Sequence, residues 1–258
     1  MDPASDPSSA QLNREAPWDA FDSDAYSEHN YRALRPDDHQ IIEIVRDHFA
    51  AHFHGRRPER PVTGVDVGAG ANLYPALAML PWCREITMFE RSAANVAWLR
   101  SQVAGYAPNW DEFWEVLLHG DGYAEVPDPR AALRAAATVQ PGDLFRLPSR
   151  RWGMGTMFFV AESLSTSHAE FRKAVNSFAE ALEPGSPFAA AFMENSEGYQ
   201  VGDHWFPACA VTEHDVEATL APYSEDMEIV RIALPGEQAA LREGYTGMIV
   251  ACGRRGAV

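Results

Sequence analysis

Two closely spaced glycines and a carboxylate further along the chain are the residues best suited to chemistry. The segment from Gly64 to Tyr74 reads GVDVGAGANLY, so a β-prone run ends at Gly68 and Gly70. Glycine permits a tight turn and a close approach of the backbone to a ligand. Glu90 closes the next apolar run, where a carboxylate can accept hydrogen bonds from a ribose diol. This layout favours a cofactor that contains a nucleoside.

The third position of the glycine pattern separates the two common nucleoside cofactors. A dinucleotide fingerprint needs a third Gly or Ala, which seats the pyrophosphate on a helix N-terminus. Counted from Gly68, that position is Leu73, and bulky Asn72 and Tyr74 flank it. An NAD-dependent oxidoreductase is therefore disfavoured. A strand–turn–helix junction that binds no ligand is the other alternative.

The same loop resembles the first motif of class I S-adenosylmethionine-dependent methyltransferases. In that motif an acidic residue, here Asp66, orients the loop, and Gly68-Ala69-Gly70 passes under the methionine part of the cofactor. The resemblance implies S-adenosylmethionine as the cofactor and S-adenosylhomocysteine as the product.

Composition bounds the class of protein. The chain has 258 residues, of which 46% are hydrophobic and 22% are charged, as expected for one α/β domain with additions. Its net charge of −16 disfavours a nucleic-acid partner. We expect no membrane span, no signal peptide and no metal site, because no apolar run is long enough and no compact ligand spacing occurs. The three cysteines indicate reduced thiols and a cytoplasmic location. Ala, Arg, Asp and Pro usage suggests a bacterial source, and the expected assembly is a monomer or homodimer.

Apolar periodicity predicts strands that alternate with helices. Strands are expected at 62–67, 85–89, near 138, 154–161, 188–193, 227–234 and 244–252, and helices at 36–54, 74–80, 92–103, 110–119, 130–136, 168–182 and 213–220. Such alternation implies right-handed crossovers, with helices on both faces. The predicted fold is α/β, with a Rossmann-like, seven-stranded, mostly parallel sheet and an antiparallel last strand.

The predicted domain organisation is a disordered tail at 1–16 and a single methyltransferase domain at 17–258. Residues 17–55 would form an N-terminal helical lid, which orders over bound cofactor, and 106–137 would form a helical insert. Because ligands of open α/β sheets bind at the carboxyl ends of strands, the residues that follow strands should share one rim. These residues are Gly68, Glu90, Asp143, Glu162 and Glu194.

Several spacings recur together after about Trp18. They are Tyr26 and Tyr31 five residues apart, the loop ending in Tyr74, Glu90 followed by Asn95, the Asp143-Leu144 pair, and the stretch from Tyr199 to Phe206. This set resembles the family that contains nicotinamide, phenylethanolamine and indolethylamine N-methyltransferases and thioether S-methyltransferase. Here Asn72 replaces the usual Thr, Glu90 the frequent Asp, and His204-Trp205 the usual substrate-pocket residues.

The resemblance implies roles for individual residues. The tyrosine pair would cover the cofactor carboxylate, Glu90 and Asn95 would bind the ribose, and Asp143 with Leu144 would flank the adenine. The expected cofactor-binding residues are Tyr26, Tyr31, Asp66, Gly68, Ala69, Gly70, Asn72, Tyr74, Glu90, Arg91, Asn95, Asp143, Leu144 and Ala161.

The predicted function is S-adenosylmethionine-dependent methyl transfer to a small-molecule acceptor, an amine or a heteroaromatic nitrogen, by in-line displacement. A protonated amine must first lose its proton, so we expect Glu162, Glu194 and His204 as catalytic groups. Tyr26, Ser163, Tyr199 and Trp205 are expected to bind the acceptor. Glu162 as a helix cap, Glu194 as a solvated strand end and His204 as a surface histidine are the structural alternatives. The alternative functions are an O- or C-methyltransferase of a secondary metabolite and a non-catalytic S-adenosylmethionine-binding protein.

Overall fold

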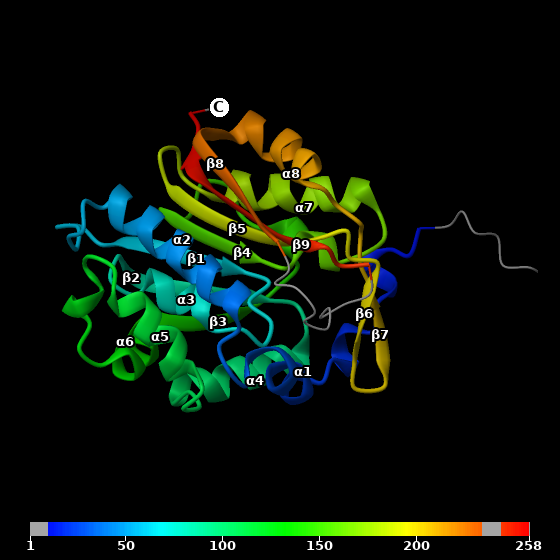
Figure 1. Cartoon of the computed structure of the whole chain (residues 1–258), viewed down its shortest axis with the longest axis horizontal. Coiled ribbons are helices and arrows are strands. Elements are labelled where there is room, and N and C mark those ends of the chain that lie inside the picture. Colours follow the sequence, from blue (N-terminus) through cyan, green and yellow to red (C-terminus); the bar gives the residue numbers. More distant parts are fainter. Residues whose placement is uncertain (1–9, 234–243, 258) are drawn as a thin grey trace, which may run out of the picture.

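A single twisted sheet forms the centre of the computed structural model, which describes residues 10–233 and 244–257 (Figure 1). The seven strands lie in the order β3 (Ala137–Pro141), β2 (Cys83–Glu90), β1 (Val62–Val67), β4 (Met154–Phe158), β5 (Pro187–Glu194), β9 (Gly247–Arg255) and β8 (Ser224–Ala233). Neighbours from β3 to β5 are parallel, whereas β9 is antiparallel to both β5 and β8. This confirms the predicted fold class, including the antiparallel last strand.

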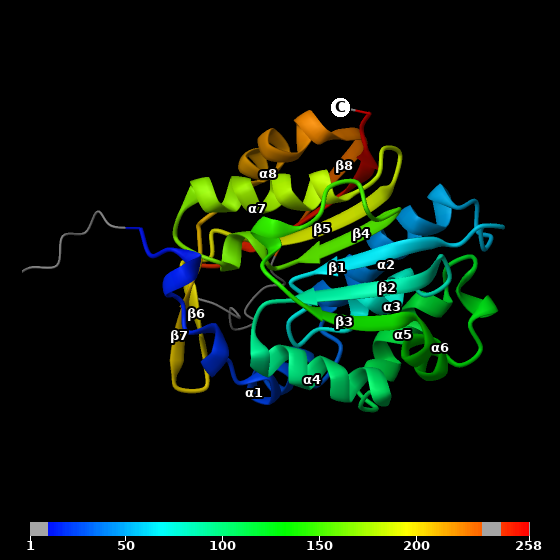
Figure 2. The same ribbon diagram turned by 180° about the vertical axis from the view of Figure 1, so that it is seen from behind.

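Two hydrophobic layers cover the sheet, one on each face (Figures 1 and 2). One layer contains α2 (Pro36–His52), α3 (Tyr74–Met79) and α5 (Trp110–Leu118), and the other contains α7 (His168–Ala181) and α8 (Glu213–Leu220). Phe49 of α2 and Trp110 of α5 are fully buried in the first layer, and Phe178 of α7 is fully buried in the second. The helices α4 (Ala93–Ala104) and α6 (Pro129–Ala136) lie toward the β3 edge. Burial of both faces explains why the central strands are almost continuously apolar.

The end of β4 differs from the prediction. The expected strand ran to residue 161, but β4 ends at Phe158. Phe159 has a φ of 60°, so the chain turns there and enters the short helix η5 (Ala161–Ser163). Residues 160–163 (VAES) follow this turn at the rim of the sheet, where they are buried without belonging to a strand. Residue 234, the expected end of the sixth strand, lies outside the described residues.

The N-terminal segment and a hairpin lie together beside the carboxyl ends of the parallel strands (Figures 1 and 2). The segment contains η1 (Asn13–Glu15), η2 (Trp18–Ala20) and α1 (Ser23–Tyr31), and the hairpin is formed by β6 (Gly198–Val201) and β7 (His204–Pro207). The ring of Phe206 lies 5.3 Å from that of Trp18 and 5.1 Å from that of Phe21. Aromatic packing therefore fixes the segment on the hairpin.

Residues 10–16, the last part of the predicted tail, include residues that contact the folded domain. Asn13 is buried, and its backbone N–H donates to the Glu170 carboxylate of α7 at 2.8 Å. Residues 1–9 lie outside the described residues. Polar composition suggested a solvated tail, but it does not show which polar groups meet partners elsewhere in the fold.

The described residues contain neither a helix suited to span a membrane nor a cluster of metal-binding side chains. None of their helices combines the length and the apolar character that crossing a membrane requires. Within the same residues, no group of three or more His, Cys, Asp or Glu side chains is arranged to hold a metal ion.

Candidate active site

The glycine loop follows β1 and turns sharply into α3. Gly68 has a φ of +68° and Gly70 a φ of +57°, conformations that favour glycine. A Cβ at Gly68 would lie 2.6 Å from Cγ1 of Val160, so this position admits no side chain. A Cβ at Gly70 would meet only the carbonyl oxygen of Gly68, at 3.6 Å. The space above Gly70 is therefore open to a ligand.

The carboxylate of Glu90 closes the loop from the neighbouring strand. Its Oε2 accepts from the N–H of Gly70 at 2.8 Å, and its Oε1 accepts from the N–H groups of Arg91 and Ser92 at 2.8 and 2.7 Å. Burial raises the pKa of Glu90, and these backbone donors oppose that shift. The carboxylate is thus held at the end of β2, next to the loop.

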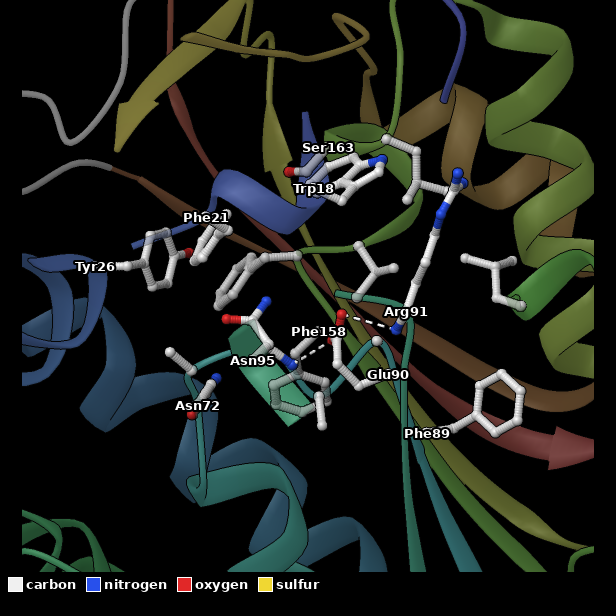
Figure 3. Close-up of a pocket in the computed structure, with 18 of the residues that line it drawn as sticks. Trp18, Phe21, Tyr26, Asn72, Phe89, Glu90, Arg91, Asn95, Phe158 and Ser163 are labelled. Atoms are coloured by element: carbon white, nitrogen blue, oxygen red, sulfur yellow. Dashed lines mark hydrogen bonds between the residues drawn. The ribbon is translucent and has the colours of Figure 1, made fainter. Parts of the chain in front are cut away.

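Asn95 of α4 connects this carboxylate to the N-terminal segment. Its Oδ1 accepts from the Ser23 hydroxyl at 2.7 Å, and its side chain also hydrogen-bonds Glu90. Figure 3 shows Asn95 and Glu90 extending toward the same space. As predicted from sequence, Ser92 caps α4 by accepting from the Asn95 N–H, which sets the helix start. The residues expected to bind a ribose diol are therefore adjacent.

These residues line one pocket at the carboxyl ends of β1, β2, β3 and β4 (Figure 3). Thirteen of the predicted site residues are among its lining. They are Tyr26, Tyr31, Gly68, Ala69, Gly70, Asn72, Glu90, Arg91, Asn95, Asp143, Leu144, Ser163 and Tyr199. The topology thus brings together segments that are far apart in the sequence, as the rule for open α/β sheets expects.

A buried amide lies at the loop side of the pocket. The Oδ1 of Asn72 accepts from the N–H of Tyr74 at 3.2 Å, which leaves Nδ2 pointing away from the backbone. This Nδ2 donates to none of the described residues, although it is buried. A buried donor without a partner is unfavourable, so a bound ligand with an acceptor oxygen would stabilise the site.

The opposite end of the cofactor region is apolar and closely packed. Asp143 caps the short helix η4 (Leu144–Arg146) by accepting from the N–H of Phe145 at 3.0 Å. A Cβ at Gly142 would lie 2.2 Å from the Phe89 ring. Gly142, Phe89 and Leu144 therefore form an apolar part of the pocket lining, with no space for a side chain at Gly142.

Aromatic side chains form the remaining wall. The ring of Tyr26 lies 5.1 Å from that of Phe21, 6.1 Å from that of Tyr31 and 6.4 Å from that of Tyr199. The Tyr199 ring stacks on Phe206 at 5.5 Å. The hairpin β6–β7 thus packs against Phe21 and Tyr26 of the N-terminal segment, and it contributes one residue, Tyr199, to the pocket.

Three predicted cofactor residues lie behind the lining. Asp66 is buried and accepts from the Thr156 hydroxyl at 2.9 Å, and Tyr74 is buried and donates to Asp38 at 3.1 Å. Ala161 is buried in the layer of α7. These residues support the loop and the rim, because none of the three side chains lines the pocket.

The pKa of Asp66 yields a prediction about stability. Burial raises this pKa from 3.8 to about 7. The folded state therefore binds the proton more tightly than the unfolded state, and the resulting stability is present below the unfolded pKa and lost as pH rises through about 7. We expect urea unfolding to show a more stable wild type at acidic than at alkaline pH. Asp66→Asn should flatten this dependence, whereas Asp24→Asn, at an exposed position of α1, should not. An unchanged slope in Asp66→Asn would contradict the assignment.

Four residues that were predicted to act in catalysis or to contact the acceptor do not line the pocket. They are Glu162, Glu194, His204 and Trp205. Glu162 is fully buried, and its Oε1 accepts from the N–H of Met193 at 3.1 Å, so it ties η5 to β5. His204 and Trp205 are on the exposed side of the hairpin, with Trp205 48% exposed. The prediction for these residues is corrected accordingly. A position after a strand placed them near the rim, but it did not show which way each side chain points.

Glu194 also has a structural role, because its carboxylate forms an ion pair with Arg231. Its Oε2 lies 2.6 Å from Nη2 of Arg231 on β8, and this guanidinium lowers the pKa of Glu194. We expect Glu194→Gln to cost about 1 kcal/mol of stability, as partly exposed ion pairs do. The pH profile of methyl transfer should be unchanged, because Glu194 does not line the pocket and its carboxylate is paired with Arg231. A loss of the acidic limb of that profile, where activity rises as a base loses its proton, would restore Glu194 as a catalytic base.

Sequence reasoning missed part of the lining. The additional residues are Asn13, Trp18, Phe21, Ala71, Phe89, Gly142, Phe158, Phe159, Val160 and Leu164. Ala71, Phe89, Gly142 and Val160 adjoin predicted site residues, so proximity in sequence could have indicated them. Asn13 carried no signal, because it lies in a segment expected to be disordered.

Comparison with known proteins agrees with this geometry. A model of the NNMT/PNMT/TEMT family matches residues 9–255. The carbon methyltransferase of CurJ is 12% identical, with 90% of this chain and 58% of that chain covered at a TM-score of 0.55. A SAM-dependent methyltransferase from Methanosarcina mazei is 10% identical, with 79% and 97% covered at a TM-score of 0.52. Comparison with curated proteins gives no significant match.

The fold and the family match define an S-adenosylmethionine-dependent methyltransferase. The chain belongs to the NNMT/PNMT/TEMT family. The residues present fit this cofactor, since Gly70 leaves open space, Glu90 offers a carboxylate acceptor and Asn72 offers a buried donor.

Proposed function

We propose that this enzyme methylates a nitrogen of a small planar acceptor, an amine or a heteroaromatic ring. The observation that carries the proposal is the chemistry of the pocket lining. Among the described residues that line it, the only Asp, Glu or His side chains are Glu90 and Asp143. Both already accept hydrogen bonds from the backbone at the cofactor end. The acceptor end therefore holds no side chain suited to act as a strong base.

We assign the cofactor to specific groups of the chain. Glu90 and Asn95 would hold the ribose, and Gly142 with Leu144 would enclose the adenine. The glycine loop and the Asn72 Nδ2 would hold the methionine part, covered by Tyr26 and Tyr31. When bound, S-adenosylmethionine supplies an activated methyl group for in-line displacement. The protein contributes position and exclusion of water.

The lack of a base favours nitrogen over oxygen or carbon. An unprotonated amine or an aromatic nitrogen already carries a free lone pair, so it can attack once it is oriented. A phenol or a carbon acid must first lose a proton, which calls for a base within hydrogen-bonding reach. Glu162 and Glu194, the strongest earlier candidates, are occupied by Met193 and Arg231 respectively.

The aromatic wall supports a planar acceptor. Trp18, Phe21, Tyr26 and Tyr199 all line the pocket, and their rings pack through the Phe206 cluster. Such rings favour flat, apolar or cationic ligands by stacking and by cation–π attraction. A methylated nitrogen that becomes cationic during transfer would be stabilised there.

The experiment is a turnover assay with matched acceptors. We expect S-adenosylhomocysteine release with aromatic amines or pyridine-type rings, and at least about ten-fold slower release with phenols of the same skeleton, as general-base catalysis typically contributes more than that factor. Turnover of phenols with no turnover of nitrogen compounds would contradict the proposal and favour the O-methyltransferase alternative. Cofactor binding without product from any acceptor would favour a non-catalytic binding protein.

A further inference from the structure

A short N-terminal strap, residues 11–18, is fastened across the rim of the pocket. The N–H of Gln11 donates to the Thr166 hydroxyl at 3.0 Å, and the N–H of Thr166 donates back to the Gln11 carbonyl at 3.1 Å. The N–H of Asn13 donates to the Glu170 carboxylate at 2.8 Å. These three bonds attach the strap to the beginning of α7, so Asn13 and Trp18 occupy defined places in the pocket lining.

The side chain of Asn13 has one orientation that its partner determines. The indole Nε1–H of Trp18 donates to the Oδ1 of Asn13 at 2.9 Å and to the Asn13 carbonyl at 2.9 Å. An indole N–H is only a donor, so the amide oxygen must face it. The amide Nδ2 is consequently turned away from Trp18, and it donates to no described residue.

This donor is available to a ligand. Asn13 is only 3% exposed and lines the pocket, so its side chain faces the pocket and not the outer surface. A donor that meets an acceptor on a ligand adds affinity and selectivity. The fold maintains the arrangement with three strap hydrogen bonds and the indole bond, which indicates a binding function.

We infer that Asn13 and Trp18 together form an acceptor-recognition element. Trp18 offers its ring to a planar molecule, and the Nδ2 of Asn13 donates to a hydrogen-bond-accepting oxygen carried by that molecule. The inference rests on the proposed function, and it specifies the acceptor class further. The acceptor would carry a carbonyl-type oxygen in addition to the nucleophilic atom.

The position of the pair separates it from the cofactor groups. The residues assigned to the cofactor come from strand ends and the glycine loop, whereas Asn13 and Trp18 come from the strap. In the view of Figure 3, Trp18 lies beside Ser163, at the other end of the pocket from Asn72. The aromatic cluster around Phe206 continues from Trp18 toward Tyr199, on the side of the hairpin.

The test uses two uncharged probes of similar size, acetophenone and ethylbenzene, which differ by a carbonyl group in place of a methylene group. Their dissociation constants are measured by ligand-observed NMR on the complex of the full chain with S-adenosylhomocysteine. For wild type we expect acetophenone to bind about five- to ten-fold more tightly than its hydrocarbon counterpart, the value of one net hydrogen bond. Equal binding of the two, or no binding of either, would overturn the inference.

Variants test whether the preference for acetophenone comes from the side-chain amide of Asn13. Asn13→Leu keeps the side-chain size and should remove the preference, and Asn13→Asp should reverse it, since a carboxylate repels a carbonyl oxygen. Arg14→Ala, which removes an exposed strap side chain, is the matched control and should retain the preference. If Asn13→Leu fails to fold, Trp18→Phe tests the same point, because the amide then loses its fixed orientation and the preference should fall.

Two readouts keep this inference apart from the proposed function. The affinity for S-adenosylhomocysteine should change less than about two-fold in Asn13→Leu, which is within the spread of a lining residue without a cofactor contact. A large loss of that affinity with an unchanged probe ratio would show that Asn13 serves the cofactor, and would overturn the inference. Neither probe is a methyl acceptor, so the nitrogen-methylation assay succeeds or fails independently.

Discussion

Glu90→Gln should raise the dissociation constant for S-adenosylhomocysteine by about a hundred-fold or more, because two charge-assisted hydrogen bonds to a ribose diol are worth about 3 to 6 kcal/mol. In the variant, the amide N–H₂ group also faces a backbone N–H that donates to the carboxylate in the wild type. Affinity is measured by calorimetric titration. The two side chains have nearly the same shape, so the loss is expected to be specific to the site.

The control for this variant lies on the same strand. Glu85→Gln removes a carboxylate from an exposed position of β2. We expect it to bind like wild type and to unfold at the same temperature. Binding by Glu90→Gln within about five-fold of wild type would show that the ribose is held elsewhere, since that factor is no more than one ordinary hydrogen bond.

Gly68→Ala should destabilise the fold by about 2 to 5 kcal/mol, the sum of the left-handed backbone cost and an overpacked contact. The new Cβ would lie 2.6 Å from Cγ1 of Val160, while φ would stay at +68°. Chemical unfolding measures the stability loss, and titration with S-adenosylhomocysteine measures the accompanying loss of binding.

A variant of the neighbouring Gly70 distinguishes the cost of backbone strain from the cost of a steric clash. Gly70→Ala has a similar φ but open space, so we expect only about 1 to 2 kcal/mol of destabilisation, the backbone term alone. Combining Gly68→Ala with Val160→Ala should recover part of the loss, because the two sites are in contact and their effects are not additive. Equal destabilisation by the two glycine variants would mean that Val160 moves aside without cost.

The sequence predicted the part of the site that depends on backbone geometry. Gly68, Gly70 and Glu90 follow strands whose apolar runs are easy to recognise, and the carboxyl ends of parallel strands must meet. Asn95 followed from the family resemblance, in which an asparagine comes five residues after the acidic residue, and both side chains line the pocket. Local rules and topology agree at these positions, which is why the cofactor half of the pocket was largely predictable.

The acceptor half was less predictable, because its residues depend on tertiary packing. Glu162 and Glu194 lie near the rim, yet each was turned toward a partner that only the fold reveals, the N–H of Met193 and the guanidinium of Arg231. The hairpin that bears Tyr199 has no clear strand pattern, since it is a short two-stranded element outside the main sheet.

The strap, residues 11–18, shows most clearly what amino-acid composition cannot predict. A Pro- and Ser-rich N-terminus indicated disorder, but Asn13 meets Glu170, far along the chain, and Trp18 meets Phe206. Long-range contacts of this kind leave no periodic trace in the sequence. They also decide which part of the acceptor the enzyme can recognise.

The measurement that tests the account most directly is a calorimetric titration of the wild-type chain with S-adenosylmethionine and S-adenosylhomocysteine, with NADH as the comparison. The account predicts one site per chain, micromolar affinity for both methylation-cycle ligands and no heat of binding with NADH. Binding of NADH, or absence of binding by S-adenosylmethionine and S-adenosylhomocysteine alike, would contradict the assignment of the glycine loop, Glu90 and Asn95 to this cofactor.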